Sequence, residues 1–351
     1  MRMATANSGG PALFPVQEGR QYLENLGFWH REAAVQDVNF RCIQETDALA
    51  EGKAKVFVVA QFKGVEHPLK VDCPKELRAL TGVSVDTLRE YVDAPELLGR
   101  LITHSVSKRA DTGIRFSGVQ DMVMDMQLAD GRAWVDPLYV FDAAVNELGE
   151  GTELEDISVA KRHLTVRFVG EHALEPPKRV GDIVRSGTII QMNGRLAVGG
   201  YAYRLICANG AQRRFDYLEP IRNAADLEMS LRNIIQVSHH QARHLTEALI
   251  SLDERPFSGN REQIVLRLSR QVRLPRSFTS RVLGQLPTLG ADATLYDLAN
   301  LMTAEARTLR SPEMVQTRLG DVITVLAPEH ARCNNCGATL ENGGTAHVTS
   351  D

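Results

Sequence analysis

An arginine-rich stretch is the part of this sequence whose residue types point most directly to a chemistry. Residues 261–281 contain six arginines and the single acid Glu262, a local net charge of six minus one, or +5. Guanidinium groups pair with phosphates through parallel hydrogen bonds, and such pairing gives affinity for nucleic acid that does not depend on base sequence. The arginines that we expect to contact phosphates, in this stretch and just before it, are Arg204, Arg213, Arg214, Arg222, Arg261, Arg267, Arg270, Arg273, Arg276 and Arg281.

Aromatic residues near these arginines would suit a single-stranded partner. Tyr201 and Tyr203, together with Phe215 and Phe278, are expected to offer ring faces on which unpaired bases can stack. The other interpretation is a solvated helix face that pairs with an acidic part of the chain, or an interface between copies of the protein.

Two cysteines near the C-terminus have the spacing of half a zinc site. Cys333 and Cys336 are separated by two residues, so both thiolates can bind one tetrahedral ion. His330 and His347 are the nearest candidates for the two remaining ligands. The alternatives are a reduced, flexible tail, or a metal site that another subunit completes.

Two further patterns give weaker support for a metal. His240 and His244 stand one helical turn apart, but Gln241 occupies the position of the catalytic Glu in a zincin motif, so a surface or packing role is favoured. Asp121 and Asp125 share one face of a predicted strand, as a two-metal nuclease requires, although a polar outer strand face explains them equally well. The sequence has no GxxxxGK[ST] and no GxSxG motif. An enzyme is therefore the least favoured class.

The charges divide the chain into an acidic part and a basic part. The 351 residues carry a net charge of −4; residues 1–160 hold 16 Lys and Arg against 25 Asp and Glu (−9), and residues 161–351 hold 24 against 19 (+5). Only two of those 24 basic residues are lysine. Arginine suits bidentate phosphate pairing better than lysine does, although the codon bias of a GC-rich genome would have the same effect.

The composition also bears on the compartment. Five scattered cysteines favour a reducing environment over a disulfide framework. The N-terminal segment lacks a continuous apolar run, and the longest apolar runs, such as Val56–Phe62, are too short to span a bilayer. We therefore expect a cytoplasmic protein with no membrane partner.

The elements that must position these residues predict an α+β fold. We expect an N-terminal α/β region (1–110), an antiparallel β core (111–222), a helical region that packs on the sheet (223–326) and a flexible tail with the two cysteines (327–351). Residues 18–50 are predicted to form one or two helices.

The β core is predicted to contain a three-stranded meander. Its strands are Thr188–Met192, Arg195–Ala208 and Ala211–Phe215, with turns at Asn193-Gly194 and Asn209-Gly210, because Asn-Gly favours tight hairpins. Gly199-Gly200 in the long middle strand predicts a bulge or a sharp bend.

The meander resembles a known family. Val180–Gly210 ends in Arg204-Leu205-Ile206-Cys207-Ala208-Asn209-Gly210 and is similar to the phage/plasmid-like proteins of domain-of-unknown-function family 932. Thr294–Thr303 resembles the late helix of that family, with Tyr296, Asn300 and Thr303 at the characteristic places. The resemblance covers roughly residues 100–325 and implies an accessory protein of a mobile element, of the kind found beside DNA-recombination genes.

Taken together, these patterns predict a phage- or plasmid-type accessory protein. We expect it to bind nucleic acid, above all single-stranded DNA, without catalysis, in recombination or replication. Self-association is also expected, and zinc at the C-terminal cysteines is one of the alternatives for the tail. The alternative function is a protein-interaction or regulatory scaffold that binds no nucleic acid.

Overall fold

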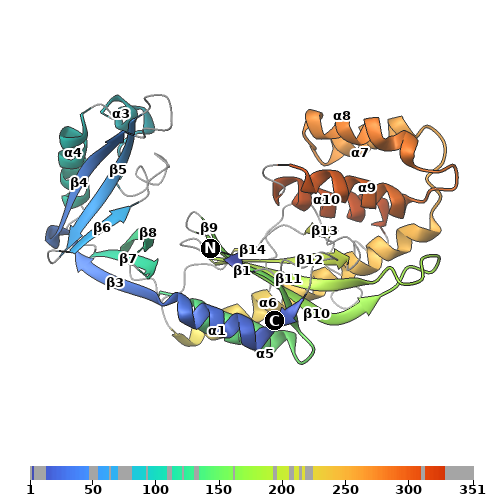
Figure 1. Cartoon of the computed structure of the whole chain (residues 1–351), viewed down its shortest axis with the longest axis horizontal. Helices are drawn as coiled ribbons and strands as arrows, with labels where there is room; N and C mark the ends of the chain where they lie inside the picture. The colour runs from blue at the N-terminus through green and yellow to red at the C-terminus, as the bar shows by residue number, and fades with distance from the viewer. Residues whose placement is uncertain are drawn as a thin grey trace, which may run out of the picture.

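The computed structural model of the chain has an α+β fold (Figure 1). It describes residues 2–3, 13–46, 54–62, 65–69, 81–91, 94–108, 113–120, 122–129, 134–160, 163–192, 196–204, 209–212, 216–217, 224–309 and 313–328. The strands are β1 (Arg2–Met3), β2 (Phe14–Pro15), β3 (Phe28–Ala34), β4 (Val38–Thr46), β5 (Ala54–Phe62), β6 (Val65–Leu69), β7 (Gly113–Val119), β8 (Met122–Ala129), β9 (Glu153–Ala160), β10 (His163–Leu174), β11 (Val184–Met192), β12 (Leu196–Arg204), β13 (Asn209–Gln212) and β14 (Asp216–Tyr217). The helices are α1 (Val16–Leu26), α3 (Val85–Glu90), α4 (Pro95–Ser107), α5 (Pro137–Leu148), α6 (Ala224–Ser251), α7 (Arg261–Gln271), α8 (Arg276–Gln285), α9 (Leu295–Arg307) and α10 (Glu313–Leu326), with short 3-10 turns η1 (Val35–Asp37), η2 (Leu252–Glu254) and η3 (Leu286–Thr288).

Among the described residues, the strands form one large antiparallel sheet and two small ones. The large sheet has the order β1-β9-β10-β11-β12-β13, with β2 also on β9 and β14 on β12. The small sheets are β3-β7-β8 and β4-β5-β6. Figure 1 shows β4–β6 with α3 and α4 at one end of the molecule, and α7–α10 at the other.

The first helix is shorter than the sequence pattern predicted. α1 ends because Gly27 takes a left-handed conformation, φ +62°, and donates its N–H to Glu24 O at 3.1 Å. Strands β3 and β4 follow, so the helical prediction over 18–50 is wrong beyond Leu26. The pairing of β3 with β7, from Phe28 opposite Val119 onward, overrides the local helical pattern.

The sheets also cross the region boundaries that we predicted. β7 and β8 pair with β3 instead of joining the large sheet, although we assigned residues 111–129 to the β core. Conversely, β1 and β2 pair with β9, so residues before 20 contribute to the large sheet.

The meander is present as β11, β12 and β13, but its second turn lies earlier than predicted. Asn209 and Gly210 are already part of β13, opposite Arg204 and Tyr203. The connection between β12 and β13 is therefore residues 205–208, which lie outside the described part of the chain, as do the predicted turn residues Asn193 and Gly194.

Gly199 and Gly200 do not form the predicted bulge. The pairing of β11 with β12 continues through both without a change of register. A Cβ atom on Gly200 would lie 2.5 Å from Ser238 O and 2.8 Å from Ala242 N of α6. The glycine is needed because a helix backbone crosses the strand at this point, not because the strand bends.

Two large cores meet along α6. The N-terminal half of α6, with Leu231 and Ile235, packs together with α1 and α5 on the large sheet. The C-terminal half, with Leu245 and Leu249, packs with α7–α10. The opposite face of the sheet carries a smaller cluster of Val169, Ile189, Tyr201 and Tyr203. α6 thus fixes the helical region, and its arginines, to the sheet.

Candidate nucleic-acid interface

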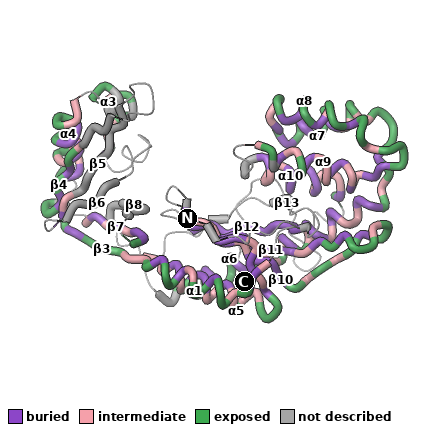
Figure 2. Tube along the Cα trace, in the orientation of Figure 1, coloured by how far each residue is buried: buried purple, intermediate pink, exposed green. Residues whose placement is uncertain are grey.

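The arginine-rich stretch folds as two helices joined by a four-residue turn. Asn260 caps the start of α7, where its side chain accepts from Gln263 N–H at 3.0 Å. Val265 and Leu268 are buried on the inner side of α7, and Phe278 and Val282 are buried on the inner side of α8. Figure 2 shows exposed residues along the outer sides of both helices.

The turn between the helices is closed by backbone hydrogen bonds. Arg273 N–H donates to Arg270 O at 3.3 Å, and Leu274 N–H donates to Ser269 O at 2.8 Å. These two bonds are the Schellman pattern that ends many helices, and Arg273 occupies its left-handed position with φ +57°. Glycine is the usual residue there, because an L side chain costs about 1–2 kcal/mol in that conformation. Val272 and Leu274 on either side are buried.

Four arginines around this turn are exposed. Arg267 and Arg270 stand in the last two turns of α7, Arg273 stands in the connection, and Arg276 is the first residue of α8. None of the four forms an ion pair with a carboxylate in the part of the chain that the structure describes. The first turn of α8 contains no acidic residue, so its helix dipole adds to the positive potential. We call these four residues the turn arginines.

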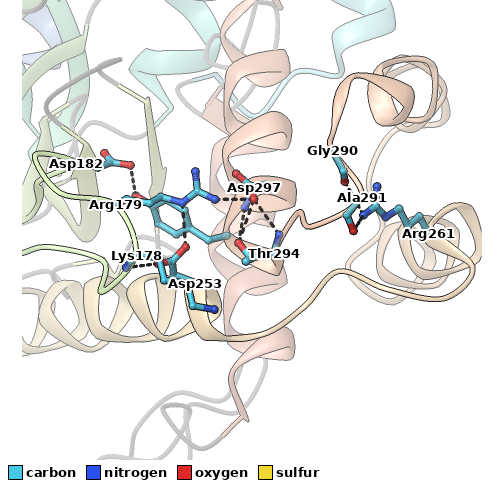
Figure 3. A network of polar contacts seen from close by, with 10 residues as sticks. Lys178, Arg179, Asp182, Asp253, Arg261, Gly290, Ala291, Thr294 and Asp297 are labelled. Atoms are coloured by element: carbon cyan, nitrogen blue, oxygen red, sulfur yellow. Dashed lines mark hydrogen bonds and ion pairs between the residues drawn. The ribbon is translucent and has the colours of Figure 1, made fainter.

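Arg261, in contrast, is occupied by the protein itself. Its guanidinium donates to Gly290 O at 2.8 Å and to Ala291 O at 3.0 Å (Figure 3). It also donates to Leu289 O at 3.2 Å, and its Nε donates to Phe257 O at 2.8 Å. Four of its five N–H groups are thus engaged, three of them with the loop before α9. Our prediction that Arg261 contacts phosphates does not fit this geometry, because the carbonyl oxygens already use its N–H groups.

Arg281 is also engaged, though at the surface. It donates to Glu305 Oε2 at 3.1 Å and contacts the hydroxyl of Thr308. Its side chain is partly exposed, so the ion pair is a surface one that contributes little to stability. A phosphate would have to compete with Glu305 for this guanidinium.

The two tyrosines predicted as stacking faces are buried. Tyr201 and Tyr203 are 2% and 1% exposed and pack edge to face with ring centroids 6.2 Å apart. Tyr201 also donates to Glu155 Oε2 at 3.1 Å, and burial, followed by the charge of Glu155, raises the pKa of Tyr201 well above its usual value. Phe278 is 1% exposed. None of these three rings can stack on a base in this conformation, because the meander turns its tyrosines into the core.

The remaining predicted site residues lie outside what the structure describes. This holds for the side chain of Arg204, for Phe215 and for all predicted zinc ligands, Cys333, Cys336, His330 and His347. It also holds for Arg213, Arg214 and Arg222. Within the described residues, no group of three or more His, Cys, Asp or Glu side chains is arranged to hold a metal ion.

A buried polar cluster, which the sequence did not predict, joins the meander to the helical region. Arg179 Nε donates to Asp253 Oδ1 at 2.9 Å, and Nη2 donates to Asp297 Oδ2 at 2.7 Å (Figure 3). The backbone N–H of Lys178 donates to Asp253 Oδ2 at 2.9 Å. Asp253 is fully buried and Arg179 is 34% exposed. We call this cluster the Arg179 joint.

The electrostatics of the Arg179 joint favour its charged state. Burial of Arg179 opposes its charge, but the hydrogen bond to Asp253 and the charges of Asp297 and Asp253 outweigh that effect and raise the pKa of Arg179. Asp297 also takes part in the capping box of α9, where it accepts from Thr294 N–H at 2.9 Å. One arginine therefore fastens the end of α6 and the start of α9 to the loop before β11.

The segments that contain Asp182 and Tyr296 also meet at this joint. Tyr296 donates its hydroxyl to Asp182 Oδ2 at 3.0 Å, and the Arg179 guanidinium lies 5.4 Å from the centroid of the Tyr296 ring. Asp182 and Tyr296 are both buried. These residues hold two segments together, and their burial gives them a structural role.

A second polar cluster lies between α6 and the sheet. The hydroxyls of Ser186, Thr188 and Ser238 are fully buried and have no hydrogen-bond partner among the described residues, and the same holds for the buried atoms His239 Nδ1 and His172 Nε2. Burial, then the charges of Arg243, His240 and His172, lowers the pKa of His239 to about 4. The pKa of His172 is lowered by burial and by Arg243. The burial of both rings, one from β10 and one from α6, thus disfavours their charged forms.

Comparison of the chain with protein families, with curated proteins and with solved structures finds no match. The site must therefore be interpreted from its own geometry. In the described part of the chain, no helix has the length and apolar character needed to cross a membrane.

Proposed function

We propose that the protein binds nucleic acid without catalysis, through phosphate contacts made by the turn arginines. The observation that supports this proposal is the division of the arginines in the helical region. The N–H groups of Arg179 donate to carboxylates and those of Arg261 donate to carbonyl oxygens, whereas the turn arginines are exposed and have no described acidic partner. Exposed cations that no internal acid neutralises are available to a polyanion.

The cellular setting belongs to the same proposal. The sequence resemblance suggests an accessory protein of a phage or plasmid, active in recombination or replication in the bacterial cytoplasm. Self-association and zinc binding at the C-terminal cysteines remain predictions from the sequence alone. Neither is needed for the turn arginines to bind phosphate.

The test is fluorescence anisotropy of the full chain with labelled DNA, in single-stranded and duplex form, across a salt series. Four phosphate contacts predict that affinity falls about 50-fold to about 150-fold between about 50 and about 200 mM salt, from slopes of about −0.7 or −0.9 per contact. Exchange of three turn arginines, R267Q/R270Q/R276Q, should weaken binding at least about tenfold at the lowest salt.

The matched control is R20Q/R100Q/R232Q. These are exposed arginines on α1, α4 and α6, so the net charge changes equally while the turn is untouched. Equal loss in both triple variants would assign binding to overall charge and not to the turn. Absence of binding to both DNA forms at the lowest salt would end the proposal and favour the protein-interaction scaffold.

A further inference from the structure

We infer that the partner of the turn arginines is duplex DNA, with the outer side of α8 facing its major groove. This inference rests on the proposed function and names its substrate. It starts from the two consecutive helices α7 and α8, which are joined by only four residues (Figure 1). In helix-turn-helix proteins, a pair of helices joined by a turn of this length binds a duplex by laying the second helix into the major groove.

The outer side of α8 has the size and chemistry for this position. The helix has ten residues, about 15 Å of length at 1.5 Å per residue, and a major groove about 12 Å wide admits one helix. Its exposed residues at the N-terminal end are Arg276, Ser277 and Ser280. Arginine and serine side chains are the types that donate to phosphates and to base edges.

With α8 in the major groove, the turn arginines lie beside this helix and face the phosphates of the DNA backbone. Arg267 and Arg270 are three residues apart and project from the same side of α7 near its end, and Arg273 projects from the turn itself. The closed backbone of the turn and the buried Val272 and Leu274 fix the positions from which these chains extend. A rigid array of charges fits a duplex, whose phosphates have regular positions, without the cost of ordering a flexible strand.

The aromatic residues of the helical region point to the same partner. Proteins that bind single strands combine basic residues with exposed rings on which bases stack. Phe257, Phe278 and Tyr296, which lie on or beside these helices, are each at most 1% exposed. The surface around the turn arginines, as far as it is described, therefore offers phosphate contacts and short polar side chains, not stacking faces.

The experiment compares a labelled duplex with either of its strands alone, using the full-length chain over the same salt series. We expect tighter binding of the duplex, a log–log salt slope of about −3.6 for four contacts, and a slope smaller by about 0.9 for each of the single variants R267Q, R270Q and R276Q. The variant S280E, which places a carboxylate on the outer side of α8, should weaken duplex binding at least about tenfold.

Each result distinguishes the inference from the function on which it rests. If the single strand binds as tightly as the duplex or more tightly, with a slope near −2.8, nucleic-acid binding stands and the duplex assignment is wrong. If S280E binds the duplex like the wild type, while circular dichroism shows unchanged helix content, α8 does not face the groove. If neither DNA form binds, the proposed function itself fails.

Discussion

The Arg179 joint and the turn arginines lie in the same helical part of the molecule, yet they use the same side chain in opposite ways. At the joint, one guanidinium is held by two aspartates, one of them fully buried, and three segments of the chain depend on it. At the turn, four guanidinium groups extend into solvent with no described acidic partner. The difference shows that the role of an arginine depends on the acceptors near it, which come from distant parts of the chain.

The largest effect is expected at the joint, from Arg179→Ala. Removal of the guanidinium leaves the buried carboxylate of Asp253 without its ionic partner, and such a loss costs about 3–5 kcal/mol. Because Arg179 itself is partly exposed, we expect a cost at the lower end of this range. The free energy of unfolding, measured with urea, should fall by about 3 kcal/mol. The control Arg232→Ala removes an arginine that is 58% exposed in a surface ion pair, and it should cost less than about 1 kcal/mol. Equal costs would mean that the joint does not hold the segments together.

A second, intermediate effect concerns pH and the buried side of α6. His239 has a pKa of about 4 in the folded protein and about 6.5 when unfolded, so between these values the unfolded chain binds a proton that the folded chain does not. Stability should therefore fall as the pH drops from about 6.5 towards about 4. Allowing for partial exposure of the ring, we expect a loss of about 2 kcal/mol.

The groups that face His239 guide the control. His172 from β10 and Arg243 and His240 from α6 all disfavour its charged form, and Glu247 acts on His172 in the opposite direction. The variant His239→Gln removes the titration and keeps a polar side chain, so its urea midpoint should depend less on pH in this window. An unchanged pH dependence would assign the acid sensitivity to carboxylates instead.

The helical part could be predicted well from the sequence because its signals are local. α6 (Ala224–Ser251) opens the helical region expected at 223–326, and an apolar stripe of helical period and nearby turn residues define it. Strand β3, which directly follows α1, could not be predicted in the same way. Its local pattern suits a helix, and its partner β7 lies far along the chain.

The candidate site was predicted by residue type but not by environment. Arg261 and Arg267 look alike in the sequence, yet three of the four carbonyl oxygens that bind Arg261 belong to residues 28 to 30 positions later. The Arg179 joint links residues 74 and 118 positions apart, and no spacing rule connects them. Gly200 is a similar case, because a glycine in a strand can indicate either a bulge or a close contact with another backbone. Only the position of α6 in the fold distinguishes the two.

The smallest effect is expected at the turn, where Arg273→Gly should stabilise the fold while it weakens DNA binding. Glycine relieves the left-handed strain of about 1–2 kcal/mol. It also gives the unfolded chain more conformational freedom, which destabilises the folded state by about 0.5–1 kcal/mol. We therefore expect the free energy of unfolding to rise by about 0.5 kcal/mol. The matched control Arg270→Gly removes the same charge from the last turn of α7, in a right-handed conformation, and should destabilise by up to about 1 kcal/mol. Thermal unfolding gives the sign for each variant, and anisotropy should show similar losses of affinity in both. A lower melting temperature for Arg273→Gly would contradict the left-handed geometry of the turn. If Arg273→Gly stabilises the fold, Arg270→Gly destabilises it, and both lose the same DNA affinity, then Arg273 contributes its charge to binding while its left-handed conformation lowers the stability of the fold.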